Sequence, residues 1–144
     1  MDSGVYRIID ANLNRVMEGI RVCEDIIRFS SDNESLTRKL KDLRHEIFGA
    51  IRNLRKEHLK ELLCSRDPSG DVGIKTSNSE RTRENLVDLF LANSQRGKES
   101  LRVLEEVLKL LDNALSHKFK TFRFSLYEIE KTAVKELGTI RDIK

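Results

Sequence analysis

The chain has 144 residues and a net charge of +3, with 35% charged and 38% hydrophobic residues. Its seven glycines and single proline are about half of the ~12% that these two residues reach in average proteins, which argues against turn-rich β-sandwiches and glycine-looped α/β folds. The small charge excess and the lack of basic runs interleaved with aromatic residues predict no nucleic-acid partner.

Four segments have apolar residues at the spacing of about 3.6 that is typical of amphipathic helices. They are predicted at about 5–29, 34–63, 79–111 and 115–137. The polar residues 30–33 separate the first two segments because they favour helix caps over helix interiors. Asp112-Asn113 separate the last two. Each pair of segments is therefore expected to form an antiparallel hairpin.

Residues 64–78 interrupt the helical pattern with the sequence CSRDPSGDVGIKTSN. A loop of about 15 residues is longer than the ~2–8 that usually join helices in a bundle, and such loops are either functional or disordered. Asp67 and Asp71 lie four residues apart in it, beside glycines that permit tight turns. These carboxylates suit Mg²⁺, which binds one or two of them together with waters and phosphates. An ordinary Asp-Pro-Ser-Gly turn is the alternative.

Residues 11–29 and 92–110 align with seven identities in nineteen positions, and LKDLR (40–44) corresponds more faintly to FKTFR (119–123). The chain thus contains a duplicated helical hairpin. The predicted fold is all-α, a four-helix bundle of two duplicated antiparallel hairpins joined by the Asp/Gly-rich loop. We expect one helical domain over 1–144, with hairpin 1 at about 5–63, the loop at 64–78 and hairpin 2 at about 79–140.

A polar stripe is retained in both copies of the repeat. It consists of Asn12, Arg15 and Glu18 in the first copy and of Asn93, Arg96 and Glu99 in the second. The three-residue spacing places each set on one flank of a helix, where we expect the side chains to be half-buried at the border of the core. One interpretation is a structural network of Arg–Glu pairs, with asparagines bonded across the pseudo-twofold axis. The other is a polar cleft in which Arg15 and Arg96 hold an anion such as phosphate.

The remaining polar and sulfur-containing residues predict structural roles. Arg21 and Arg102 lie farther from the core and are expected to pair with Asp25 and Glu106. Cys23 is predicted to be a core residue because the repeat places a leucine at the equivalent position. The cysteines and histidines have no metal-ligand spacing, so no zinc site is expected.

Two features of the sequence bear on where the protein resides. The first 15 residues contain charges and no apolar signal segment, and no apolar run approaches the ~18–20 residues that span a bilayer. Two cysteines without a disulfide framework favour a reducing compartment. We therefore expect a cytoplasmic protein without a membrane partner.

Four motifs in order, YRIIDANLNRVMEGIRVCED, LTRKLKDLRHEI, SRDPSGDVGI and LANSQRGKESLRVLEE, resemble a known family. They are similar to the hydroxymethylpyrimidine phosphate kinases of thiamine biosynthesis, a helical domain that is also fused N-terminal to some bacterial thiamine phosphate synthases. The resemblance covers about residues 5–130. It implies phosphoryl transfer from ATP, with Mg²⁺, to 4-amino-5-hydroxymethyl-2-methylpyrimidine phosphate, which gives the diphosphate.

The family motifs and this chemistry suggest the site residues. We assign phosphate clamping and catalysis to Arg15, Arg96 and Arg66, substrate binding to Asn12, Glu18, Asn93, Glu99 and Arg44, and the metal to Asp67 and Asp71. The expected partners are the pyrimidine phosphate, ATP and a functionally linked synthase, and such amphipathic helices are also compatible with a homodimer. The alternatives are a non-catalytic helical module that assists a separate thiamine phosphate synthase, and a purely structural dimerisation domain.

Overall fold

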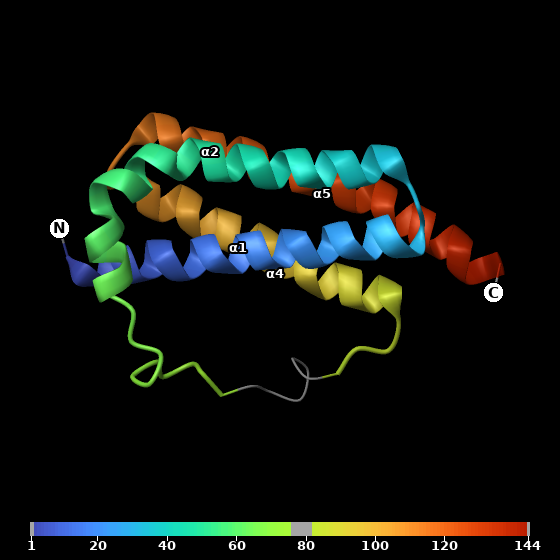
Figure 1. Ribbon diagram of the computed structural model, residues 1–144, viewed down its shortest axis with the longest axis horizontal. Helices are drawn as coiled ribbons and strands as arrows, with labels where there is room; N and C mark the ends of the chain where they lie inside the picture. The colour runs from blue at the N-terminus through green and yellow to red at the C-terminus, as the bar shows by residue number, and fades with distance from the viewer. Residues whose placement is uncertain (1, 76–81, 144) are drawn as a thin grey trace.

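The computed structural model describes residues 2–75 and 82–143, with side chains described up to Gly138. Its helices are α1 (Ser3–Ser30), α2 (Glu34–Cys64), α4 (Leu86–Leu108) and α5 (Asn113–Ile143) (Figure 1). Within the described ranges every regular element is an α-helix. The predicted all-α four-helix bundle is confirmed.

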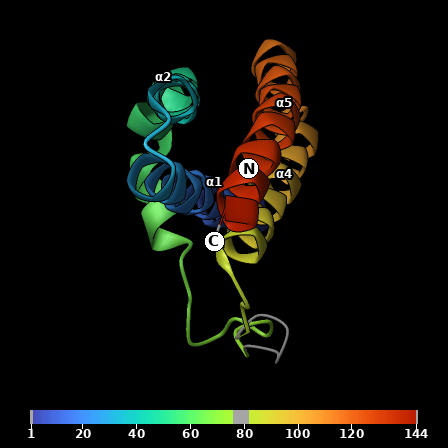
Figure 2. The same cartoon turned by 90° about the vertical axis from the view of Figure 1, so that its right-hand side faces the viewer.

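The helices form two antiparallel hairpins whose first members pack against each other. α1 contacts α2 in the first hairpin, α4 contacts α5 in the second, and α1 and α4 contact each other in the middle of the bundle. Viewed end-on, α2 and α5 diverge from this central pair (Figure 2). α2 and α5 also contact each other, but the seam between α1 and α4 is the more extensive contact between the two hairpins.

Polar side chains at the predicted breaks start new helices. Asn33 caps α2, and its side chain accepts a hydrogen bond from the Leu36 amide at 3.0 Å. The preceding Asp32 has a φ of 53°, in the left-handed region that Asp tolerates better than most residues. Asp112 accepts a hydrogen bond from the Leu115 amide at 3.1 Å at the start of α5. Both predicted hairpin turns are confirmed.

The second hairpin begins later than the sequence predicts. The predicted start at residue 79 lies outside the described residues, and the described residues 82–85 are not helical. Asn85 has an extended backbone (φ −157°, ψ 178°) and caps α4 by accepting a hydrogen bond from the Asp88 amide at 2.8 Å. Because 82–85 are all polar, a helix there would have no apolar face to bury.

α4 also ends earlier than predicted, at Leu108 instead of residue 111. The amides of Leu110 and Leu111 bond to carbonyls three residues back, at 3.0 Å each, which is the tighter bonding typical of a helix end. α5 begins at Asn113 and continues past the predicted end at 137. The connection between α4 and α5 is thus short, as an antiparallel pair requires.

The core lies between the helices and contains the apolar residues whose spacing predicts the helices. Its fully buried members include Ile9, Ile20, Leu40, Ile47, Leu101, Leu104, Phe119 and Leu126. Cys23 is also completely buried in this cluster, as predicted. In the described part of the chain, no helix is both long enough and apolar enough to cross a membrane.

Two ion pairs occupy equivalent positions of the sequence repeat. Arg44 Nε lies 3.0 Å from Glu24 Oε1 in the first hairpin, and Arg123 Nη2 lies 3.1 Å from Glu105 Oε2 in the second. The repeat aligns Glu24 with Glu105 and Arg44 with Arg123. Both carboxylates are buried, so each needs the arginine from the neighbouring helix to neutralise it. The predicted surface pairs are also present, Arg21 with Asp25 at 3.7 Å and Arg102 with Glu106 at 3.1 Å.

A glycine lets α1 and α4 approach closely at the seam. A Cβ atom added at Gly19 of α1 would lie 2.9 Å from the backbone carbonyl oxygen of Asn93 in α4. Such a distance is shorter than real Cβ atoms show, so any larger residue at this crossing would push the two helices apart. The close approach brings the polar flanks of α1 and α4 next to each other.

Candidate functional site

A polar pocket of about 530 Å³ lies at the seam, between α1, α4 and the loop that joins α2 to α4. The described residues of this loop that follow α2, 65–75, lie on the side of the bundle formed by α1 and α4 (Figure 1). We call this hollow the seam pocket. Its lining residues are Asn12 and Arg15 of α1, Asp71, Gly73 and Ile74 of the loop, and Arg96, Glu99, Ser100 and Val103 of α4. The volume is within the range of small-molecule sites.

On the α1 side, a buried asparagine supports an arginine. Asn12 is 5% exposed, and its Nδ2 donates a hydrogen bond to the carbonyl of Ile8 at 2.8 Å. Its Oδ1 is thereby turned outward and accepts a bond from Arg15 Nη1 at 3.5 Å. The predicted position of Asn12 at the border of the core is confirmed. Arg15 extends from there to the pocket wall.

The charged members of the stripe are more exposed than the sequence predicts. Arg15, Glu18, Arg96 and Glu99 are all exposed, so the prediction that they are half-buried is wrong. They lie on the outer flanks of α1 and α4, and three of them, Arg15, Arg96 and Glu99, line the pocket together with loop residues. The expected Arg–Glu network is also missing, since no ion pair joins Arg15 to Glu18 or Arg96 to Glu99, all four of which are described.

Arg15 and Arg96 differ in this respect from the arginines that form ion pairs in the bundle. Within the described residues, neither guanidinium has a carboxylate within 4.0 Å. Six other arginines do have such a partner: Arg21, Arg38, Arg44, Arg66, Arg102 and Arg123. Two unneutralised cations from different helices line one pocket, which is an arrangement suited to an anion.

On the α4 side, three further residues complete the wall. Glu99 Oε1 accepts a hydrogen bond from Gln95 Nε2 at 3.0 Å, which leaves its second oxygen available to a ligand. Ser100 is buried at 3% exposure, and its hydroxyl is a donor and an acceptor at the pocket. Val103 adds apolar surface beside it. The wall can therefore bind an anion, a polar group and an apolar ring surface.

The two loop aspartates have different surroundings. Asp71 lines the seam pocket, and its Oδ1 accepts a hydrogen bond from the Gly73 amide at 2.9 Å. Asp67 does not line it. The Asp67 carboxylate caps a turn instead, where Oδ1 accepts bonds from the Gly70 amide at 3.0 Å and the Ser69 hydroxyl at 3.2 Å. A Cβ at Gly70 would collide with Asp67 Oδ2, so a larger residue there would displace the Asp67 carboxylate from this turn.

Besides Asp67, four predicted site residues lie away from the seam pocket. Glu18 is exposed on α1 and is not among the lining residues. Asn93 is half-buried, with Nδ2 donating to the Leu89 carbonyl at 2.9 Å. Arg44 faces the buried Glu24. Arg66 is bound to Asp10 of α1 by Nε at 2.5 Å and Nη2 at 2.8 Å, and these hydrogen bonds raise the pKa of Arg66. Their assigned roles at the site stay predictions.

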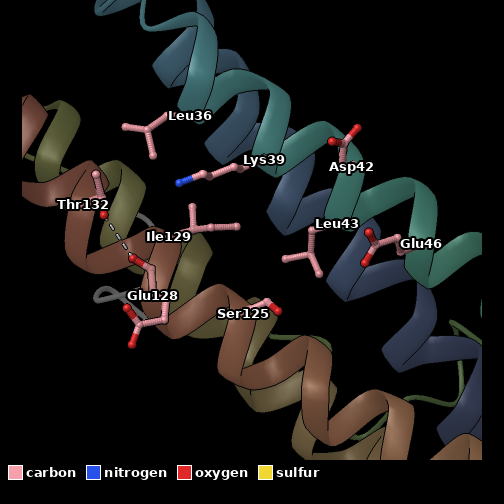
Figure 3. A pocket seen from close by; sticks show the side chains of 9 residues that line it. All are labelled: Leu36, Lys39, Asp42, Leu43, Glu46, Ser125, Glu128, Ile129 and Thr132. Atoms are coloured by element: carbon pink, nitrogen blue, oxygen red, sulfur yellow. Dashed lines mark hydrogen bonds between the residues drawn. The ribbon is translucent and has the colours of Figure 1, made fainter.

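A second hollow of about 450 Å³ lies between α2 and α5, where these helices diverge (Figure 3). Leu36, Leu43 and Ile129 form its apolar surface. The charged side chains that line it are those of Lys39, Asp42, Glu46 and Glu128. One cation among three carboxylates repels a phosphate group on balance, so the seam pocket is the better anion site.

The sequence patterns do not single out two residues of this region, Ser100 and Asp10. Ser100 lies four residues after Arg96, so helical spacing places the two on one face and provides a signal for it. Asp10 lies within the motif YRIIDANLNR, but no local spacing indicates its partner Arg66, which is 56 residues away.

Comparisons with known proteins identify the family. The model of the ThiD2 family matches residues 7–132, which is most of the chain, so the chain belongs to this family. It is 39% identical over 127 residues to a thiamine-phosphate synthase of Nostoc punctiforme, a match that covers 88% of this chain and 34% of the relative. A thiamine-phosphate synthase of Rhodopirellula baltica is 38% identical over 125 residues, which is 85% of this chain and 32% of the relative.

The chain spans about a third of the length of the curated relatives it matches. No solved structure matches the chain. The family assignment therefore comes from the amino-acid sequence alone. The geometry of the seam pocket is an observation that does not depend on that assignment.

Proposed function

We propose that this member of the ThiD2 family is a kinase that transfers a phosphoryl group from ATP to 4-amino-5-hydroxymethyl-2-methylpyrimidine phosphate and forms the diphosphate. The observation that carries the proposal is the pair Arg15 and Arg96, which approach one pocket from two helices without a carboxylate partner among the described residues. The sequence resemblance supplies the substrate, and relatives named thiamine-phosphate synthase support a place in thiamine biosynthesis.

The chemistry of this reaction suits the residues of the pocket. The accepting oxygen belongs to a phosphate that is already ionised near neutral pH, so the enzyme needs no general base to deprotonate it. The main barrier is the repulsion between two polyanions that must be brought together in line. Guanidinium groups reduce that repulsion and hold phosphate oxygens by paired hydrogen bonds. Arg15 and Arg96 would serve this purpose.

The other lining residues would select and orient the substrate. Asn12 holds Arg15 through its Oδ1, at 3.5 Å from Nη1, and so limits where the guanidinium can lie. Glu99 has a carboxylate oxygen available to accept a hydrogen bond from the exocyclic amine of the pyrimidine. Val103 and Ile74 offer apolar surface to the ring from opposite sides, α4 and the loop.

Asp71 is suited to Mg²⁺ and Asp67 less so. Mg²⁺ is usually held by one or two carboxylates together with waters and substrate phosphates. Asp71 lines the pocket, and its Oδ2 has no protein hydrogen bond among the described residues. Asp67 has its carboxylate folded against Gly70, outside the lining. The described residues also contain no cluster of three metal-ligating side chains, so bound phosphates would have to supply further ligands. Mg²⁺ would neutralise phosphate charge there.

The proposal is tested by measuring ADP release with the pyrimidine phosphate, ATP and Mg²⁺. Arg15→Ala and Arg96→Ala should each lower kcat/KM by about tenfold or more, since a hydrogen bond to a charged group contributes roughly 1.5–3 kcal/mol. Arg38→Ala is the matched control, because Arg38 is an exposed arginine on α2 that pairs with Glu34 at 2.9 Å. Pure folded protein without turnover, or equal rates in all three variants, would refute the kinase assignment.

A second function is favoured by the relatives, in which the matched region is only about a third of a thiamine-phosphate synthase. In that case the chain would be a non-catalytic module that binds a thiamine precursor and assists a separate synthase. Calorimetry separates the two functions. Binding of the pyrimidine phosphate to the seam pocket without formation of ADP would support the module, whereas turnover supports the kinase.

A further inference from the structure

The loop that contributes Asp71 to the seam pocket is tied to α1 by one side-chain contact. Arg66, two residues after the end of α2, donates from Nε and Nη2 to the two carboxylate oxygens of Asp10. Such a two-bonded arginine–carboxylate contact fixes the orientation as well as the distance of the two groups. Arg66 lies five residues before Asp71 in the sequence.

The loop's other hydrogen bonds do not join it to α1. The amides of Gly70, Asp71 and Ile74 bond to carbonyls three residues back, and the Asp67 and Asp71 side chains cap the same turns. These bonds shape the loop internally. Among the hydrogen bonds between described residues, those of Arg66 to Asp10 alone join residues 66–75 to a helix other than α2.

The burial of the two partners shows which of them is the fixed point. The Asp10 side chain is 12% exposed, whereas that of Arg66 is 44% exposed. A buried carboxylate on a helix needs a positive partner, so Asp10 holds Arg66 and not the reverse. α1 is packed into the core here, because the adjacent Ile9 is completely buried.

Asp10 and Arg15 lie on different flanks of α1. At about 100° per residue, five positions rotate the helix by roughly 140°, so the two side chains leave it in clearly different directions. Asp10 faces the end of α2, where Arg66 follows, and Arg15 faces the seam with α4. The chain between Arg66 and Asp71 must therefore connect these two flanks of α1.

We propose that Asp10 is a positioning residue, which holds the loop across α1 through Arg66 so that Asp71 and Ile74 face Arg15 and Arg96. Its effect on turnover rests on the proposed kinase function, but its effect on the loop does not. Asp10 touches no substrate in this scheme. It determines where the carboxylate of Asp71 lies relative to the two phosphate-binding arginines.

A fluorescent reporter tests the loop directly. The chain contains no tryptophan, so Ile74→Trp introduces a single probe at the pocket wall, where Ile74 is 60% exposed. Asp10→Asn should make this tryptophan more accessible to acrylamide, with a red-shifted emission maximum. Arg66→Lys should have a similar but smaller effect, since it keeps the charge but loses the two-bonded geometry. Because Arg66→Lys alters an exposed side chain, this variant should fold and can test the contact even if Asp10→Asn fails to fold.

Glu130→Gln is the matched control. Glu130 is a shielded carboxylate, 18% exposed, that pairs with Lys98 at 2.9 Å between α4 and α5, away from the loop. Its neutralisation should leave the tryptophan unchanged. If Asp10→Asn and Arg66→Lys both leave the reporter unchanged, or if Glu130→Gln changes it equally, Asp10 has no positioning role.

The second readout is kcat/KM, measured in protein that keeps Ile74 and therefore lacks the tryptophan reporter. Asp10→Asn should lower kcat/KM by about tenfold, the change expected when a remote substitution misplaces a reacting group, and Glu130→Gln should remain close to the unaltered protein. Wild-type protein without turnover would refute the kinase function and leave the reporter to decide on Asp10. Turnover that Asp10→Asn does not change would overturn the positioning role while the kinase function stands.

Discussion

The close crossing of α1 and α4 leads to a sharp prediction for two glycines. Gly19 and Gly49 both lie inside long helices, where alanine is favoured over glycine by about 1 kcal/mol. A Cβ at Gly49 would meet no atom within 4 Å, so Gly49→Ala should stabilise the protein by about that amount. At Gly19 the same atom would lie 2.9 Å from the Asn93 carbonyl oxygen, which belongs to a backbone and cannot rotate away.

The expected cost at Gly19 follows from this distance. An ordinary Cβ contact begins at 3.4 Å, so α1 and α4 must separate by about 0.5 Å (3.4 minus 2.9) or bend locally. Overpacking of this kind costs roughly 1–3 kcal/mol, from which the helix-propensity gain of about 1 kcal/mol is subtracted. Gly19→Ala should therefore be neutral to about 2 kcal/mol destabilising, and about 1–3 kcal/mol less stable than Gly49→Ala.

Urea unfolding followed by circular dichroism measures both variants, with an unchanged slope as the sign that only stability differs. In thermal unfolding each kcal/mol corresponds to roughly 2–4 °C for a chain of about this size. Gly19→Ala should also reduce turnover, because it separates the helices that carry Arg15 and Arg96, and Gly49→Ala should not. Equal stability of the two alanine variants would show that α1 and α4 do not meet at Gly19.

Three further predictions concern the metal ligand, the cysteines and a helix cap. Asp71→Asn should raise the Mg²⁺ concentration needed for half-maximal turnover, whereas an unchanged requirement would place the metal elsewhere. Burial, together with the nearby charge of Glu130, raises the pKa of Cys23 from 9.0 to about 12, so a thiol reagent should modify only the exposed Cys64 in the native protein. Since the unfolded thiol ionises first, this group should lower the stability as pH rises from about 9 to 12, as pH-dependent unfolding would measure. Asp112→Ala should cost about 1 kcal/mol in urea unfolding by removing the cap of α5.

The local features of the fold can be derived from the sequence. Apolar spacing locates the helices because each helix must bury one face. Asn33 and Asp112 mark turns because their side chains bond to free amides at the helix starts. The duplication likewise predicts the pairs of Arg21 and Arg102 with acidic residues one turn away. In each case the interacting groups lie within about four residues of each other.

Only part of the candidate site can be predicted from the sequence. The repeat indicates Arg15 and Arg96, and the loop composition indicates Asp71, which the structure places around one pocket. Arg44 and Arg66 have the same charge and were expected at the site, but their guanidinium groups face Glu24 and Asp10. Sequence spacing cannot distinguish these cases, because the neutralising carboxylate is 20 residues away in one case and 56 in the other.

The sequence by itself thus determined the four helices, their pairing into two hairpins and the residue types available for binding phosphate. Only the tertiary structure decided which cations are neutralised, how far the loop extends before α4 begins, and where the stripe of Asn12 and its neighbours meets solvent. The physical reason is the range of the interactions. Helix periodicity and capping act between near neighbours in the chain, whereas burial and charge neutralisation depend on which distant segments pack together.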